Sequence, residues 1–178
     1  LGSIGRPGPG VEVRLVRPDG AEAPVGAEGE IWVRSPTLAS GYWRREAPEF
    51  AGGWWRSGDV ARRDAEGYLW FADRIRNVIV SGGENIYPAE LERVLAAVPG
   101  VREAAVVGVA DDRWGAVPVA AVVADGVTEA EVLAAFEGRL ARFKRPRRVV
   151  FLDALPRNAM GKVVPAALRR RVQTAPAG

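Results

Sequence analysis

Apolar and polar residues alternate along much of the first 73 residues, a pattern typical of half-buried β-strands. Val11, Val13 and Leu15 alternate with charged residues, so their side chains would share one face of a sheet. Similar apolar runs surround Trp32 and cover residues 68–71, and turn sequences such as Pro-Asp-Gly separate them. We therefore predict a small β-rich unit in this part of the chain.

The pattern changes after residue 77, where predicted strands and helices alternate. Pro88 suits the first turn of a helix, and the apolar residues that follow it recur on one helical face. Thr128 and Glu131 have the spacing of a capping box at the start of a second helix. A short basic helix is predicted at the end of the chain, and apolar runs of strand length occupy residues 104–110, 117–124 and 148–152. The second half is therefore predicted to be a compact α+β domain.

The composition limits the chemistry that this chain can perform. It has 178 residues, 48% of them hydrophobic, which is enough to bury a core in one ordinary or two small domains. Histidine and cysteine are absent, which excludes Ser-His-Asp and Cys-His nucleophile systems, disulfides and the usual zinc ligand sets. Any chemistry must use Lys, Arg, Asp, Glu, Ser, Tyr and backbone amides.

The formal net charge of +3 favours anionic partners, which could be phosphorylated small molecules or nucleic acids. No apolar run approaches the roughly 20 residues needed to span a bilayer, and no secretory signal opens the chain, so we expect a cytoplasmic protein. The chain begins at Leu1 and enters a glycine-rich segment at once. We expect its natural start to lie upstream and the sequence to be a fragment.

Lys162 is unusual, because only it and Lys144 are lysines among 25 basic residues. It ends the segment Leu-Pro-Arg-Asn-Ala-Met-Gly-Lys at residues 155–162. A compact ammonium in a glycine-containing turn can act as a point charge on a phosphate and a carboxylate at once. The alternative is that the lysine reflects codon usage and the turn only leads into a helix.

Three further segments could carry chemistry, and each also has a plain structural explanation. Asp59 follows Ser-Gly and could accept hydrogen bonds from both hydroxyls of a ribose, or it could close a surface turn. The Ser-Gly-Gly turn at residues 81–83 offers backbone amides to a ligand, or it could be a simple connection. Residues 143–148 contain four cations and an aromatic, which suit a phosphate or a solvated face.

Together these segments resemble the adenylate-forming superfamily of acyl-CoA synthetases, and the resemblance covers essentially the whole chain. Its motifs occur in the family's order at residues 41–43, 53–59, 73–92 and 156–162. The resemblance implies an α+β fold. Residues 1–75 would be the last, barrel-like subdomain of a large N-terminal AMP-binding domain. Residues 76–178 would be the mobile C-terminal domain, with a short three-stranded sheet and helices.

The resemblance also implies roles for residues near the nucleotide. Asp59 would hold the ribose hydroxyls of ATP, and Arg74 would contact the ribose and phosphate. Lys162 would be catalytic and bridge the attacking carboxylate and the α-phosphate. Arg76 falls at the family's hinge, where aspartate or lysine is usual, so arginine is a mild departure.

A second set of implied residues would bind CoA. The Gly82-Gly83 loop would reach the pantetheine tunnel after the domain rotates, with Trp114 near it. Trp114 could equally serve core packing or cover a turn. Phe143, Arg145 and Arg147 match positions that meet the nucleotide end of CoA in benzoate-type ligases.

The implied function is an AMP-forming acid–CoA ligase that activates a fatty or aromatic acid as an acyl-adenylate and transfers it to CoA by domain alternation. It would use ATP, Mg²⁺ and CoA. We assign no metal ligand to these residues, because the family's magnesium-binding segment has no counterpart here. The fragment alone is expected to be inactive.

Two alternatives stay open. An adenylation or loading module would pass its acyl group to a carrier-protein phosphopantetheine instead of free CoA, although the basic cluster around Arg145 favours CoA. A non-catalytic basic module could bind nucleotides or nucleic acid. Against it, the aromatic residues concentrate in the strand half of the chain, away from the basic clusters. The sequence contains no feature from which an oligomeric state can be predicted.

Overall fold

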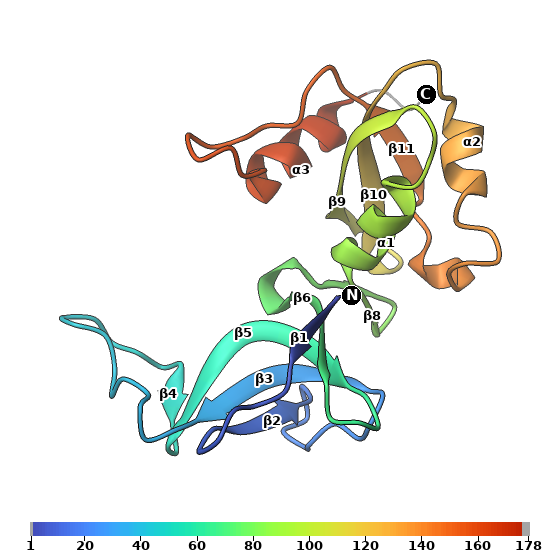
Figure 1. Cartoon of the computed structure of the whole chain (residues 1–178). Coiled ribbons are helices and arrows are strands. Elements are labelled where there is room, and N and C mark those ends of the chain that lie inside the picture. The colour runs from blue at the N-terminus through green and yellow to red at the C-terminus, as the bar shows by residue number, and fades with distance from the viewer. Residues whose placement is uncertain (1, 176–178) are drawn as a thin grey trace. The chain divides into compact units, whose positions relative to one another are not determined.

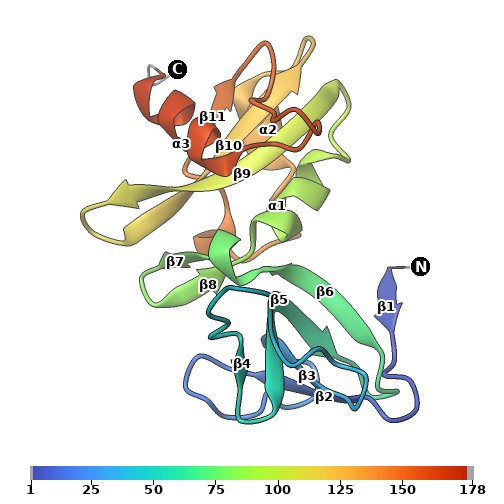
Figure 2. The same ribbon diagram turned by 90° about the vertical axis from the view of Figure 1, so that its left-hand side faces the viewer.

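The computed structural model of this chain describes residues 2–175, which form two compact units (Figures 1 and 2). Unit 1 comprises Leu1–Arg76 and unit 2 comprises Asn77–Gly178. Unit 1 consists of strands, whereas unit 2 mixes strands with all three α-helices of the described residues. The predicted α+β class is therefore confirmed. The roles assigned to the two parts within a larger enzyme stay predictions.

Unit 1 is built on one antiparallel sheet of six strands. The strands follow the order β1-β6-β5-β3-β2, with β4 paired to β5. Within the described residues this sheet runs openly from β1 to β2 and forms no closed barrel. The edge strands β1 and β2 do not pair with each other, and without that pairing a sheet cannot close. The strands are Ser3–Gly5 (β1), Glu12–Val16 (β2), Glu28–Arg34 (β3), Phe50–Ala51 (β4), Trp54–Arg63 (β5) and Leu69–Arg74 (β6).

The alternation seen in the sequence of unit 1 places a small core on one face of the sheet. Leu15, Ile31, Ala61 and Leu69 form this buried cluster. Arginine and tryptophan side chains from neighbouring strands stack elsewhere in the unit. For example, the Arg56 guanidinium lies 4.5 Å from the centre of the ring of its cross-strand partner Trp32. Such cation–π pairs add to the stability of a sheet whose core is small.

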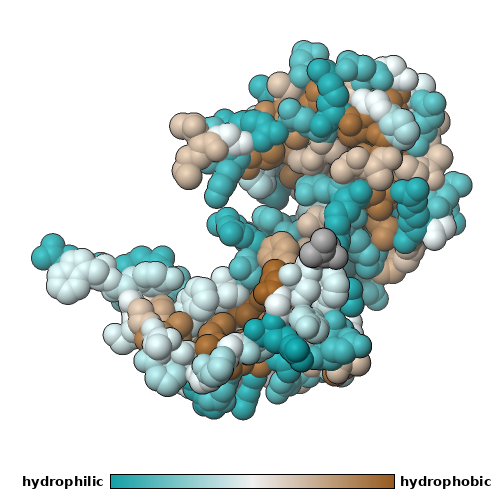
Figure 3. Space-filling model, in the orientation of Figure 1, coloured by the Kyte–Doolittle hydropathy of each residue, from teal (hydrophilic) through white to brown (hydrophobic). Residues whose placement is uncertain are grey.

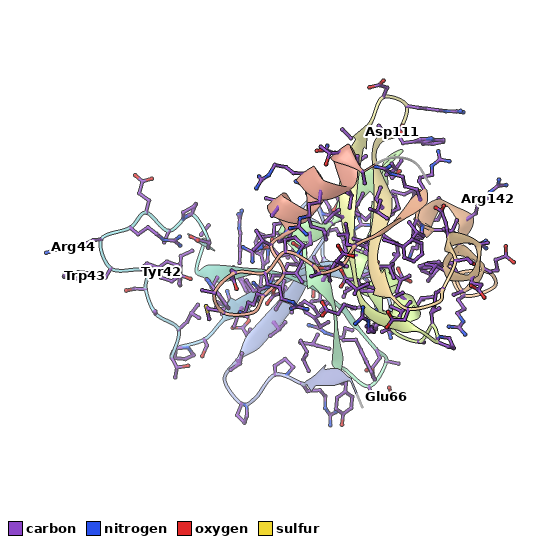
Figure 4. All side chains as sticks on the ribbon, turned by 90° about the horizontal axis from the view of Figure 1, so that it is seen from above. Tyr42, Trp43, Arg44, Glu66, Asp111 and Arg142 are labelled. Carbon is purple, nitrogen blue, oxygen red and sulfur yellow. The ribbon has the colours of Figure 1, made fainter. Side chains whose placement is uncertain are left out.

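A long loop between β3 and β4 protrudes from unit 1 and carries the Gly-Tyr-Trp motif (Figure 4). The rings of Tyr42 and Phe50 make an edge-to-face contact, with 5.6 Å between their centres. Trp43 is 86% exposed, and its only stacking partner among the described residues is the adjacent Arg44. The protruding loop is pale to hydrophilic in the space-filling view, without a continuous hydrophobic patch (Figure 3).

Unit 2 is a three-layer structure around a three-stranded sheet of order β11-β10-β9 (Figure 2). Strands β9 and β10 form an antiparallel hairpin, and α2 provides the crossover from β10 to the parallel strand β11. A small hairpin of β7 and β8 precedes α1. The elements are Ile79–Ser81 (β7), Glu84–Ile86 (β8), Pro88–Leu95 (α1), Val101–Asp111 (β9), Gly115–Ala124 (β10), Glu129–Ala134 (α2), Arg148–Phe151 (β11) and Pro165–Thr174 (α3). Two 3-10 turns, Ile75–Asn77 (η1) and Arg142–Lys144 (η2), complete the chain.

Helices cover both faces of this sheet, which explains why its central strand β10 is almost continuously apolar. Val106, Ala120 and Val122 face the layer of α1 and α2. Val107 and Val119 belong to the opposite cluster, which contains Leu168 and Val172 of α3. The predicted three-stranded sheet and its helices are therefore confirmed. So is the capping box of Thr128 and Glu131 at the start of α2.

Both edge strands of this sheet have a backbone amide capped by a carboxylate from a neighbouring helix. The amide of Val106 in β9 donates to Oε1 of Glu92 in α1 at 2.9 Å. The amide of Val149 in β11 donates to Oε1 of Glu129 in α2 at 2.8 Å. These caps satisfy buried donors that lack a strand partner on that side.

None of the helices found among residues 2–175 combines the length and the apolar character needed to cross a membrane.

Candidate functional site

A pocket of about 880 Å³ opens on unit 2, and it gathers most of the residues expected to bind CoA. Its walls come from the β7–β8 turn, the β9–β10 hairpin, α2 and the segment around η2. Five of the six predicted CoA residues line it, although they are spread over 66 positions of the chain, from residue 82 to residue 147: Gly82, Trp114, Phe143, Arg145 and Arg147. The fold thus brings these five residues, which come from three separate segments of the sequence, into one pocket.

Gly82 and Trp114 form the most specific contact in this pocket. The Gly82 amide donates to the Trp114 carbonyl at 2.9 Å. Gly82 has φ +59°, and a Cβ at this position would lie 2.7 Å from Cε3 of Trp114. The indole is 37% exposed, so Trp114 both covers the glycine turn and presents a ring to the pocket. The interpretation of Trp114 as turn cover is therefore supported, and its contact with CoA stays a prediction.

Gly83, the remaining residue of the predicted CoA set, does not line the pocket. It has φ +86°, and no atom lies within 4 Å of the place where a Cβ would be. At Gly83 only the left-handed backbone conformation favours glycine. At Gly82 the nearby Trp114 ring also leaves no room for a side chain.

The pocket has a strongly basic rim. Arg113 and Arg142 line it together with Arg145 and Arg147, while Glu84 and Glu137 are its acidic residues. Four guanidinium groups against two carboxylates make a rim suited to a phosphorylated ligand. Arg142 lies at the outer edge of unit 2 (Figure 4).

Sequence reasoning missed Arg113 and Arg142 as pocket residues. Arg142 precedes by one position the basic segment that we considered, and Arg113 is next to Trp114. Adjacency to a candidate residue was the available signal. It was weak because the chain has 25 basic residues, most of them exposed.

Three of the four cations in the segment 143–148 have partners within the chain, and for one of them, Arg145, the contact is from Nε to the Leu140 carbonyl at 3.2 Å. Nζ of Lys144 lies 2.8 Å from Oε2 of Glu90 in α1, and both side chains are half-buried. The Arg148 guanidinium donates to the carbonyls of Val172 and Ala175 at the end of α3. The contacts of Lys144 and Arg148 join the segment to two helices, whereas Arg145 and Arg147 line the pocket.

Asp59 and Arg74 form a pair in unit 1. They are opposite each other in strands β5 and β6, and Nε of Arg74 lies 3.4 Å from Oδ1 of Asp59. The Asp59 amide donates to the Ser57 hydroxyl at 3.1 Å, and the preceding Gly58 has φ +72°. Both side chains keep substantial exposure, 36% for Asp59 and 53% for Arg74. The carboxylate therefore remains accessible to a ligand with paired hydroxyls.

Arg76 is exposed and lies in η1, as the last residue of unit 1. The chain passes from one compact unit to the other at this residue. Hinges are commonly residues at the end of an element, and the hinge role of Arg76 stays a prediction.

Lys162 lies on a tight turn in the loop between β11 and α3 (Figure 1). An isolated β-bridge between Arg157 and Val163 closes the turn. Inside it, Oδ1 of Asn158 accepts hydrogen bonds from the amides of Met160 and Lys162, both at 3.0 Å. Gly161 supplies the left-handed conformation with φ +76°. The turn is therefore a defined structure that presents an exposed lysine.

The comparisons with known proteins agree with this arrangement. Residues 90–162 match the family model of the AMP-binding enzyme C-terminal domain, and residues 1–43 match that of the AMP-binding enzyme. The chain is 48% identical over 168 residues to indoleacetate–CoA ligase from Aromatoleum aromaticum, covering 91% of this chain and 33% of that protein.

Two solved structures of o-succinylbenzoate CoA synthetase from Bacillus subtilis are similar to the chain, each at 41% identity. The complex with its acyl-adenylate intermediate gives a TM-score of 0.86 and covers 100% of this chain and 37% of that one. The complex with ATP and magnesium gives 0.83 and covers 97% and 36%. The chain thus spans about a third of the length of the relatives it matches.

Proposed function

Because the chain belongs to the AMP-binding enzyme family, we propose that it forms the C-terminal part of an AMP-forming acid–CoA ligase. In the first half-reaction a carboxylate oxygen attacks the α-phosphorus of ATP, and pyrophosphate leaves. In the second, the CoA sulfur attacks the acyl carbon, and AMP leaves. The whole enzyme would thus convert a carboxylic acid, ATP and CoA into acyl-CoA, AMP and pyrophosphate.

The observation that carries this proposal is the pocket of unit 2. Its volume of about 880 Å³ lies within the range of small-molecule sites. It combines a flat aromatic wall at Trp114, a glycine turn and four arginines. Arg145 and Arg147 would bind the phosphates at the nucleotide end of CoA. The turn at Gly82, lying against Trp114, would guide the narrow pantetheine arm.

The first half-reaction would use Asp59, Arg74 and Lys162. The exposed Asp59 carboxylate would accept hydrogen bonds from the ribose hydroxyls of ATP, with Arg74 beside it. Lys162 would place its ammonium between the carboxylate and the α-phosphate, where negative charge grows in the transition state. The domain alternation about Arg76 would then move Lys162 away from the acyl-adenylate and bring the pocket of unit 2 to it.

Magnesium would bind the ATP phosphates in the whole enzyme. We assign none of its ligands here, because the segment that holds magnesium in the family has no counterpart among these residues. The two relatives named above act, by their names, on indoleacetate and o-succinylbenzoate. A fatty acyl CoA synthetase from Mycobacterium tuberculosis is also similar, at 44% identity over 96% of this chain, so both a fatty and an aromatic acid stay candidates. The cytoplasmic location stays a prediction.

The alternatives make different demands on the pocket. A carrier-protein phosphopantetheine lacks the adenosine phosphates of CoA, so it would leave the arginine rim unused.

The nucleic-acid alternative has to be judged on the folded chain, because the aromatic and basic residues that are separate along the sequence lie together in three dimensions. Arginines lie over tryptophan rings throughout unit 1, including Trp32, Trp54 and Trp70. These guanidiniums already occupy ring faces on which bases would have to stack.

The test is to separate the two half-reactions in the intact polypeptide that carries this chain. Lys162→Ala should slow carboxylate-dependent ATP–pyrophosphate exchange by about 100- to 1,000-fold, while thioester formation from a supplied acyl-adenylate should be retained. Met160→Ala is the matched control, because Met160 is an exposed neighbour on the same turn. Equal losses in the two half-reactions would contradict the role of Lys162.

A further inference from the structure

The turn that carries Lys162 is attached to strand β9 by one arginine. Nη1 of Arg157 donates to the carbonyl of Gly161 at 2.6 Å. Nη2 of the same guanidinium donates to Oε2 of Glu103 in β9 at 2.7 Å. Neither Glu103 nor Arg157 lines the pocket of unit 2, and neither has a role in the function proposed above.

These contacts act on the peptide unit that joins Gly161 to Lys162. Its carbonyl group is held by Arg157, and its N–H group donates to Oδ1 of Asn158 at 3.0 Å. Because a peptide unit is planar and rigid, holding both of its polar groups fixes its orientation. That orientation sets the direction in which the Lys162 side chain leaves the backbone.

We propose that Glu103 and Arg157 are positioning residues for Lys162. Glu103 orients the Arg157 guanidinium, and Arg157 orients the Gly161–Lys162 peptide, so that the ammonium reaches the carboxylate and α-phosphate in a narrow range of directions. This inference rests on the proposed function of Lys162. It adds two residues that would act on the adenylation step without touching the substrates.

Physical chemistry supports a positioning role over a merely stabilising one. The Glu103 and Arg157 side chains are 41% and 43% exposed, and an ion pair with such exposure contributes little to stability. Lys162 is exposed and has a long flexible side chain, so its reach depends on the rigidity of its base. Only the planar fork of arginine can donate to a carbonyl and a carboxylate in fixed directions.

The experiment measures both half-reactions and the melting temperature in the intact protein. Arg157→Met should slow ATP–pyrophosphate exchange by about 10- to 100-fold, through kcat and not through KM for ATP. Thioester formation from a supplied adenylate and the melting temperature should stay near those of the wild type. Arg157→Lys should recover only part of the exchange rate.

A double-mutant comparison tests whether Glu103 acts through Arg157. Glu103→Gln should slow exchange in the wild type and should add no further loss in the Arg157→Met background. The control is Arg102→Ala. Arg102 forms another exposed ion pair from the same strand, with 3.0 Å between its Nε and Oδ2 of Asp125, and does not contact the Lys162 turn. Its exchange rate should match the wild type.

The outcomes separate this inference from the proposed function. If Lys162→Ala slows exchange and Arg157→Met does not, the positioning role is wrong while the role of Lys162 stands. If Lys162→Ala leaves exchange intact, both are wrong. Equal losses in the two half-reactions of Arg157→Met, or losses that follow its melting temperature, would overturn the positioning role in favour of a structural one.

Discussion

The indole ring of Trp114 lies against the backbone of Gly82 so closely that a Cβ on the glycine would come within 2.7 Å of Cε3. The neighbouring Gly83 has a similar backbone conformation but open space around its Cα. A substitution at Gly83 would therefore show the effect of backbone strain alone, whereas one at Gly82 would add a clash with the indole ring.

Gly82→Ala should be more destabilising than Gly83→Ala. Both substitutions place a side chain in the left-handed region, at about 1–2 kcal/mol each, but only the first also displaces Trp114. Gly82→Ala should therefore weaken thioester formation with CoA while leaving ATP–pyrophosphate exchange intact. Thermal melting and the two half-reactions of the intact protein check this. Equal melting temperatures for the two variants would show that the close contact between Gly82 and Trp114 does not affect stability.

Substitutions within the basic segment should divide according to where each side chain points. Arg145→Met or Arg147→Met removes a cation from the pocket and should raise KM for CoA about 10-fold or more, because a charge-assisted contact with phosphate is lost. Lys144→Met removes the contact with Glu90 and should leave KM for CoA unchanged. A rise in KM for CoA with Lys144→Met equal to that with Arg145→Met would show that net charge matters and the geometry of the pocket does not.

The edge cap on β11 should matter for stability. Glu129→Ala leaves the buried Val149 amide without its acceptor, which should lower the free energy of unfolding by about 1–3 kcal/mol. Glu129→Gln keeps a side-chain oxygen at the same place and should lose less than half of that. Urea denaturation of both variants measures the difference. Equal losses would mean that the helix charge of Glu129, and not the cap, is responsible.

The capping box of α2 should give a pH-dependent contribution. The Thr128 backbone amide, and then its hydroxyl, donate to Glu131 and hold the pKa of that carboxyl below its usual value. A lowered pKa in the folded state means that the stabilisation is complete above the unfolded pKa, about 4.3. It is lost as the pH falls through the lower folded pKa.

Glu131→Gln tests this contribution directly. At pH 7 the variant should be less stable than the wild type, and the difference in urea midpoint should shrink as the pH falls below about 4. Thr128→Ala should show the same convergence, since it removes the hydroxyl that donates to the Glu131 carboxylate and accepts from the Glu131 amide. A difference that stays constant between pH 7 and pH 3 would contradict the role of the Glu131 charge.

Much of the local structure of this chain follows from its sequence alone. The alternation through Val13 and Leu15 predicts β2, and the spacing of Thr128 and Glu131 predicts the start of α2. Such features depend on residues that are neighbours in the chain, and their preferences act within one turn or one strand. The order and spacing of the motifs likewise suffice to identify Asp59 and Lys162 as candidate residues.

Tertiary structure alone decided which side chains meet. The local charge pattern does not distinguish Lys144 from Arg145, and only the family resemblance selected Arg145; in the structure Lys144 contacts Glu90 in α1 and Arg145 lines the pocket. Nor does the sequence indicate that Arg157 joins the Lys162 turn to Glu103, 54 residues away. The reason is physical: periodicity gives the face on which a residue lies, whereas the partner on that face depends on how distant elements pack. The open edges of the sheet in unit 1 have the same origin, because closure of a sheet depends on pairing between strands that are far apart in the sequence.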